Sequence, residues 1–161
     1  MGSYLNPGNS GFSNMRNDVY VDKTEMISLI NQTINTPRNL TCISRPRRFG
    51  KSFAAKMLCA YYDKTCDSKE LFDDLKIAKD DEYLKYLNQY DVIYLDMASV
   101  LGVTSSEDAV SYVKRNITEE VLDIYSEVKE AEALFDTLAN LVTYTGNKII
   151  MIIDEWDAPI R

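Results

Sequence analysis

The chain has 161 residues, of which 45% are hydrophobic, so it can build the core of one ordinary domain. It contains no histidine, which excludes Ser-His catalysis and imidazole metal sites. The net charge is −7, but residues 1–66 carry nine basic and four acidic side chains, whereas residues 67–161 carry nine and 21. The basic residues of the first part cluster at Arg45, Arg47, Arg48 and Lys51, and such a patch within an acidic protein suits a compact polyanion such as a nucleotide.

The first part of the chain predicts a loop, a helix and a strand. Residues 1–19 are rich in Asn, Gly and Ser and predict a loop. A helix is expected to begin at Asp22, which suits an N-cap with Glu25 three residues later, and to end before Pro37. Residues 40–44, Leu-Thr-Cys-Ile-Ser, predict a short strand.

Helices and strands alternate from Lys51 onward. A helix begins at Lys51, with apolar residues at every third or fourth position. Residues 67–91 predict one or two short helices, and residues 92–96 predict a second strand. This alternation is typical of a layered α/β fold.

The last third predicts two amphipathic helices and a buried strand. The first helix begins near Ser105 and has an apolar stripe at Val110, Val113, Ile117, Val121, Ile124 and Val128. The second carries Leu134, Leu138 and Leu141 and ends at Gly146. Residues 148–153 do not alternate, so both faces of this strand are expected to be buried, as in a parallel sheet covered by helices.

The segment between the first strand and the Lys51 helix has the position of a phosphate-binding loop. It reads Arg45-Pro46-Arg47-Arg48-Phe49-Gly50-Lys51-Ser52, whereas the standard pattern is G-x-x-x-x-G-K-S/T, so Arg45 replaces the first glycine. Gly50 would let the backbone approach phosphates. Lys51 would place its charge on the β and γ oxygens, and the Ser52 hydroxyl would ligate Mg²⁺. The alternative is a basic surface turn whose arginines are solvated or ion-paired.

The strand at residues 149–153 is followed by Asp154 and Glu155. In an open α/β sheet, ligands bind beyond the carboxyl ends of the strands, which would place Asp154 beside the phosphate loop. Asp154 would hold Mg²⁺, and Glu155 would orient the attacking water as a catalytic residue. The alternative is a buried strand that ends in two solvated acids.

These motifs resemble the bacterial AAA-ATPase-like domain family, whose members pair an R-P-R-R-F-G-K-S/T loop with an I-D-E-W/Y-D-x-P strand end. The resemblance extends to Leu5-Asn6-Pro7-Gly8-Asn9 with Phe12, and to Tyr20-Val21-Asp22-Lys23-Thr24. It implies a P-loop NTPase fold of three α/β/α layers with a mainly parallel sheet. The Tyr20–Thr24 segment is either a capped, packed helix start or a nucleotide contact.

In the fold that this resemblance implies, further strands, a sensor, an arginine finger and a lid follow the acidic strand end. We therefore expect an N-terminal fragment, incomplete at its C-terminus. Residues 1–38 would form an N-terminal loop and helix, and residues 39–161 a partial ATPase core of the same domain.

The sequence thus predicts ATP and Mg²⁺ as ligands, with hydrolysis by Lys51 and Glu155 in the complete protein. A non-catalytic module whose partner affinity is switched by the nucleotide is an alternative, and so is a kinase or GTPase that uses the same loop. A further alternative is a nucleic-acid-binding domain using Arg45, Arg47 and Arg48, although the net charge disfavours it. The partner, protein or nucleic acid, is left open.

Targeting signals do not stand out in this sequence. The longest strongly apolar run, residues 149–153, is too short to span a bilayer, and the first residues lack a secretory pattern. The three cysteines form no C-x-x-C pair, which suits a reducing compartment. A cytoplasmic protein without membrane contact is expected.

Overall fold

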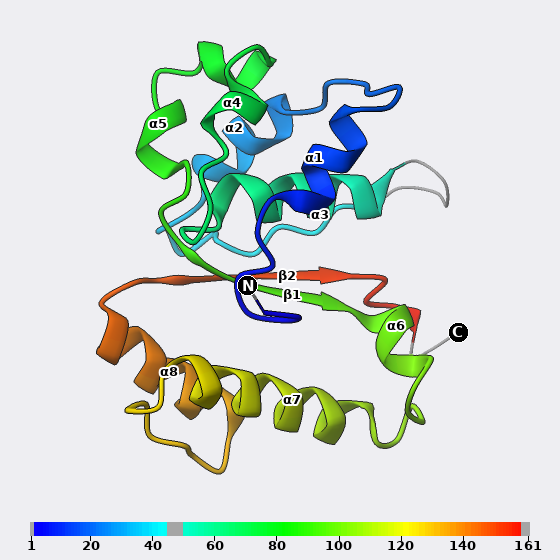
Figure 1. Ribbon diagram of the computed structural model, residues 1–161, viewed down its shortest axis with the longest axis vertical. Helices are drawn as coiled ribbons and strands as arrows, with labels where there is room; N and C mark the ends of the chain where they lie inside the picture. Colours follow the sequence, from blue (N-terminus) through cyan, green and yellow to red (C-terminus); the bar gives the residue numbers. More distant parts are fainter. Residues whose placement is uncertain (1, 45–49, 159–161) are drawn as a thin grey trace. The chain divides into compact units, whose positions relative to one another are not determined.

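The computed structural model describes residues 2–44 and 50–158, which form two compact units (Figure 1). One unit joins the residues up to Pro7 with those from Tyr90 onward, and the other is Gly8–Gln89. The sequence-based division after residue 38 remains a prediction. None of the helices in the described ranges combines the length and apolar character that crossing a membrane requires.

The first unit is built on two parallel strands, β1 (Asp91–Asp96) and β2 (Ile149–Asp154). Asp91 pairs with Ile149 and Asp96 with Asp154, so the carboxyl ends of both strands lie at the same edge. The predicted α/β class and the two predicted strands in this unit are confirmed. The three-layer P-loop architecture with a wider sheet remains a prediction.

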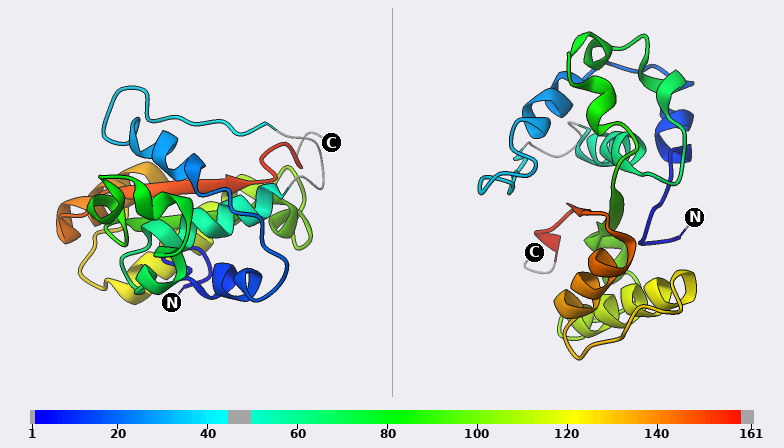
Figure 2. Two further views of the ribbon diagram at one scale, coloured as in Figure 1. Left: turned by 90° about the horizontal axis from the view of Figure 1, so that it is seen from above. Right: turned by 90° about the vertical axis from the view of Figure 1, so that its left-hand side faces the viewer.

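Three helices connect β1 to β2: α6 (Met97–Leu101), α7 (Ala109–Ile124) and α8 (Leu134–Thr145). The helices α7 and α8 contact each other and lie on one side of the strands (Figures 1 and 2). Gly146 ends α8 with a φ of 71°, as predicted for a C-terminal glycine. The short helix α6 has no counterpart among the predicted elements.

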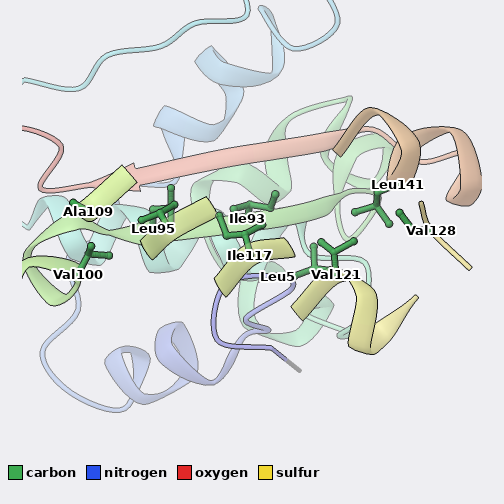
Figure 3. Packing of buried hydrophobic residues seen from close by; sticks show 10 residues of the cluster. Leu5, Ile93, Leu95, Val100, Ala109, Ile117, Val121, Val128 and Leu141 are labelled. Carbon is green, nitrogen blue, oxygen red and sulfur yellow. The ribbon is translucent and has the colours of Figure 1, made fainter. Parts of the chain in front are cut away.

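The core of this unit lies between the strands and α7 (Figure 3). The predicted stripe places Val113, Ile117 and Val121 in this core, each no more than 9% exposed. They belong to a cluster that also contains Leu5, Ile93, Leu95, Val100, Ala109, Val128 and Leu141. Burying each large aliphatic side chain stabilises the fold by roughly 1.5–3 kcal/mol. Val110 is 78% exposed, so part of the predicted stripe faces solvent.

Residues 4–6 lie along β1 and pair with it in antiparallel fashion. The backbone N of Tyr94 donates to the carbonyl of Tyr4 at 2.8 Å, and the backbone N of Asn6 donates to the carbonyl of Val92 at 2.7 Å. The buried Asn6 side chain donates to Asp91 Oδ1 and accepts from the backbone N of Val92, both at 2.8 Å. Its φ of 53° lies in the left-handed region, which Asn tolerates better than most residues. Asn6 therefore fastens this segment to β1.

The second unit, Gly8–Gln89, is helical. Its elements are α1 (Ser10–Arg16), α2 (Glu25–Asn31), α3 (Lys51–Tyr62), α4 (Lys69–Phe72), the 3-10 helix η1 (Lys76–Lys79) and α5 (Tyr83–Tyr86). Its core is aromatic: the ring of Phe72 stacks on Phe12 at 4.9 Å and meets Tyr61 edge-on at 5.4 Å. The predicted helix from Lys51 is confirmed as α3.

Two of the elements predicted for this unit, a loop and a strand, are wrong. The helix α1 lies within residues 1–19, which predict a loop, because fully buried Phe12 packs on Phe72 and this burial outweighs the local composition. Residues 40–44 are not a strand, and Leu40 is 94% exposed. A segment of β-forming residues becomes a strand only with a hydrogen-bonding partner, and the described part of Gly8–Gln89 contains no strand that could pair with it.

The strand β2 is less covered than its apolar sequence predicts. Met151 and Ile153 are 44% and 47% exposed. In the register they stand opposite Ile93 and Leu95, which are almost fully buried. The prediction that both faces of this strand are buried is therefore wrong for β2, because the core of this unit covers β1 more fully than its neighbour.

Candidate functional site

Gly50 forms the turn into α3. Its φ of 77° and ψ of 33° lie in the left-handed region, which glycine adopts without a steric penalty because it has no Cβ. Its carbonyl accepts from the backbone N of Ala54 at 3.0 Å, so the helix begins at once. A Cβ on this residue would meet the Nζ of Lys23 at 3.0 Å. Glycine thus keeps the backbone open at the point where a charged side chain approaches it.

The first turn of α3 is accessible, whereas the rest of the helix is anchored. Lys51 and Ser52 are half-buried, but Met57 and every residue after it up to Tyr62 are buried. The Tyr62 hydroxyl donates to Asn31 Oδ1 at 2.7 Å. The first N–H groups of a helix have no partner within it and lie at the positive end of its dipole. A firmly held helix therefore presents N–H donors and the charge of Lys51, which suits an anion.

The structure describes three of the eight residues predicted for the phosphate loop. Gly50, Lys51 and Ser52 lie together at the start of α3. The other five, Arg45, Pro46, Arg47, Arg48 and Phe49, lie outside the described residues. Their nucleotide contacts remain predictions.

The Tyr20–Thr24 segment is held against η1 by Asp22. The Oδ1 of Asp22 accepts from the backbone N and the Oγ1 of Thr24 at 2.8 and 2.7 Å, and its Oδ2 accepts from the backbone N of Lys76 at 2.8 Å. Burial raises the pKa of Asp22, but these hydrogen bonds outweigh burial and lower the pKa below its ordinary range. The helix α2 begins after Thr24, so the predicted N-cap at Asp22 is wrong: its carboxylate joins two segments instead.

The strand β2 ends in two carboxylates with different surroundings. Asp154 is 6% exposed, and its Oδ1 accepts from the backbone N of Glu155 at 3.0 Å. Glu155 is half-buried and has a φ of 50°, an unusual value for a residue with a long side chain. Such strain persists only where the surroundings enforce it, and it concentrates at functional sites. The roles of Asp154 in holding metal and of Glu155 in catalysis remain predictions.

A third carboxylate, Asp96, lies at the same sheet edge, opposite Asp154 in the register. Its Oδ1 accepts from the backbone N of Ala98 and Ser99 at 3.0 and 3.2 Å, and its Oδ2 accepts from Ser99 Oγ at 2.7 Å. These bonds make it the N-cap of α6. The sequence offered a signal for this position, since Asp96 ends a predicted strand whose carboxyl end meets that of its parallel neighbour. Its bonds commit it to a structural role.

The candidate residues fall into two groups. Lys51 and Ser52 belong to Gly8–Gln89, whereas Asp154 and Glu155 belong to the other unit. Within residues 2–44 and 50–158, no three His, Cys, Asp or Glu side chains gather as a metal site would require. Mg²⁺ bound with a nucleotide needs only one or two protein ligands, because phosphates and waters supply the rest. The Ser52 hydroxyl and the Asp154 carboxylate are oxygen donors of the kind that Mg²⁺ prefers.

A parallel α/β unit that ends in paired acids, together with a glycine–lysine–serine helix start, is typical of the nucleotide-binding α/β proteins. The family model described as "Predicted AAA-ATPase" matches residues 7–161, and the chain belongs to this family. The resemblance inferred from the motifs is thereby confirmed. Comparisons with curated proteins and with solved structures give no match.

Proposed function

We propose that this chain binds Mg-ATP and that the complete protein hydrolyses it to ADP and phosphate. The observation that carries the proposal is the left-handed Gly50, followed directly by Lys51 and Ser52 at the accessible start of a helix whose second half, from Met57 to Tyr62, is buried. Membership of the predicted AAA-ATPase family supports ATP as the nucleotide.

The start of α3 would bind the triphosphate. The Lys51 ammonium would neutralise the β and γ oxygens, and the backbone N–H groups of the first turn would donate to them. The Ser52 hydroxyl would ligate Mg²⁺. The buried second half of α3 supports this role, because a fixed helix places these donors with little loss of conformational entropy on binding.

The end of β2 would supply the acidic half of the site. Asp154 would hold Mg²⁺ through water, and Glu155 would orient the water that attacks the γ phosphate. The positive φ of Glu155 supports its role, because backbone strain of this kind concentrates at functional sites.

Calorimetric titration with Mg-ATP tests the binding step. Lys51→Ala should weaken affinity by about tenfold or more, because a charge-assisted hydrogen bond contributes about 1.5–3 kcal/mol. Lys56→Ala, which removes an exposed lysine from the same helix, is the matched control and should bind like the wild type. Equal affinity of the wild type and Lys51→Ala would refute the proposal.

Phosphate release tests the hydrolysis step. Glu155→Gln in the complete protein should keep Mg-ATP binding and lower turnover by about 10²–10⁴-fold, the usual contribution of a positioned acid or base. Binding without release by the unaltered complete protein would instead support the nucleotide-gated module. Competition by GTP as strong as that by ATP would contradict the choice of ATP.

A further inference from the structure

A cavity of about 320 Å³ lies beside the first two turns of α3, entirely within Gly8–Gln89. The residues that matter for its chemistry are Val19, Val21, Lys23, Gly50, Phe53 and Met57. Its volume is at the lower end of the range for small-molecule sites. Most of the lining is apolar, with one cation.

The apolar part of the lining is unusually accessible. Val19, Val21 and Phe53 are 92%, 67% and 56% exposed. Single exposed apolar side chains are ordinary, but exposed apolar side chains gathered around one cavity indicate a binding surface. A flat aromatic ligand could stack on Phe53 and contact the two valines.

The cation lies where the cavity meets the start of α3. The Nζ of Lys23 is 3.0 Å from the position that a Cβ of Gly50 would occupy. Phe53 directly follows Ser52, so the apolar wall and the predicted phosphate ligands are consecutive on one helix. A ligand with a planar apolar end and an anionic end would therefore match the cavity from Phe53 to Gly50.

The wall opposite α3 is held in place at both ends. The Tyr20 hydroxyl donates to Met57 Sδ at 3.6 Å, and its ring meets Phe12 edge-on at 5.5 Å. Two residues further on, Asp22 binds the backbone of Thr24 and of η1. Val21 lies between Tyr20 and Asp22, and Lys23 directly follows Asp22, so both cavity residues are next to an anchored side chain. A wall that is already ordered loses little conformational entropy when a ligand binds.

We propose that this cavity binds the base and ribose of the nucleotide, with the base against Phe53 and Val21, and that Lys23 contacts the phosphates. This inference rests on the proposed function, because the start of α3 fixes the phosphate end of the same ligand. It gives the Tyr20–Thr24 segment both roles that its sequence left open: the segment is packed before α2, and it contacts the nucleotide.

Two probes separate this inference from the proposed function: Mg-ATP and Mg-tripolyphosphate, which has the phosphates but no base. Each is titrated calorimetrically into the same variants. Phe53→Ala should weaken the binding of Mg-ATP by about tenfold, the usual effect of losing a stacking ring, and leave the binding of Mg-tripolyphosphate unchanged. Leu29→Ala, which truncates an apolar residue that is 65% exposed and lies outside the cavity, is the matched control and should change neither affinity.

A second pair of variants tests the cation. Lys23→Ala should weaken the binding of both probes by about tenfold. Lys79→Ala, which removes an exposed lysine of η1 outside the cavity, should weaken the binding of neither. Val21→Ser tests the apolar contact of the base with the opposite wall without altering α3. An unchanged circular dichroism spectrum verifies that each variant is folded.

The outcomes are distinguishable. If Phe53→Ala and Val21→Ser bind Mg-ATP as tightly as the wild type, the cavity is not the nucleoside site, although the phosphate site at Lys51 stands. Equal weakening of ATP and tripolyphosphate by Phe53→Ala also overturns the inference, because stacking would then not be the cause. If the wild type binds neither probe, the proposed function and this inference both fail.

Discussion

Replacing Asp22 would release the Tyr20–Thr24 segment from η1. The carboxylate accepts two hydrogen bonds from Thr24 and one from the backbone N of Lys76. A hydrogen bond to a charged group contributes about 1.5–3 kcal/mol, but the contributions of three bonds to one half-buried carboxylate do not add. We therefore expect Asp22→Ala to lower the free energy of unfolding of Gly8–Gln89 by about 2 kcal/mol. Asp22→Asn keeps one acceptor oxygen and should cost about half as much.

Hydrogen exchange followed by mass spectrometry measures this effect locally. A loss of about 2 kcal/mol should speed exchange of the Lys76 amide by about 30-fold where exchange reports local opening. Asp81→Ala, which removes an exposed carboxylate from the same unit, is the control. Wild-type exchange at Lys76 in Asp22→Ala would refute the reasoning.

The effect of Asp22 should depend on pH with a definite sign. Its pKa in the folded protein is lowered by the hydrogen bonds that outweigh burial. The contribution of Asp22 to stability is therefore fully present above its ordinary pKa of about 4, and it is lost as the pH falls through the lower pKa of the folded protein. The stabilities of the wild type and Asp22→Ala should converge below about pH 4. A constant difference between neutral and acidic pH would show that the charge of Asp22 is not involved.

Two further predictions concern residues with positive φ. Gly50→Ala should cost about 1 kcal/mol in a urea titration, because it forces a Cβ into the left-handed region, and should weaken ATP because the Cβ displaces Lys23. Gly146→Ala is the matched control, because Gly146 has a φ of 71° and open space around it, and this variant should lose a similar amount of stability. Unaltered affinity of Gly50→Ala for ATP would contradict the prediction. Asn6→Ala should cost about 2 kcal/mol, since it removes two buried hydrogen bonds, one of them to Asp91, and an unchanged melting temperature would contradict this.

The elements that sequence predicted well depend on local signals. The start of α3 follows from Gly50 and the apolar spacing after it, and the end of α8 follows from Gly146. The strand β2 could be predicted because a run of five apolar residues before Asp154 suits little else. In each case a residue and its immediate neighbours contain the information.

The failures depend on contacts between distant residues. Residues 40–44 have β-forming side chains, but the strand needs a partner that they do not specify. The helix α1 forms because Phe12 packs on Phe72, and Asp22 acts on Lys76, 54 residues away. The cavity beside α3 could not be predicted at all, because its two walls come from separate parts of the chain. The eight-residue loop was recognisable as a motif, yet its first five residues lie outside the described structure.

The pairing of residues 4–6 with β1 has a consequence for the order of folding. Besides the bonds to β1, the backbone N of Tyr4 donates to Glu120 at 2.9 Å, across 116 residues of sequence. During synthesis Gly8–Gln89 is complete before β1 exists. Residues 4–6 must wait until β1 and α7 have been made. Closing so long a loop is entropically costly and slow, so the unit that contains Asp154 and Glu155 should fold last and set the folding rate.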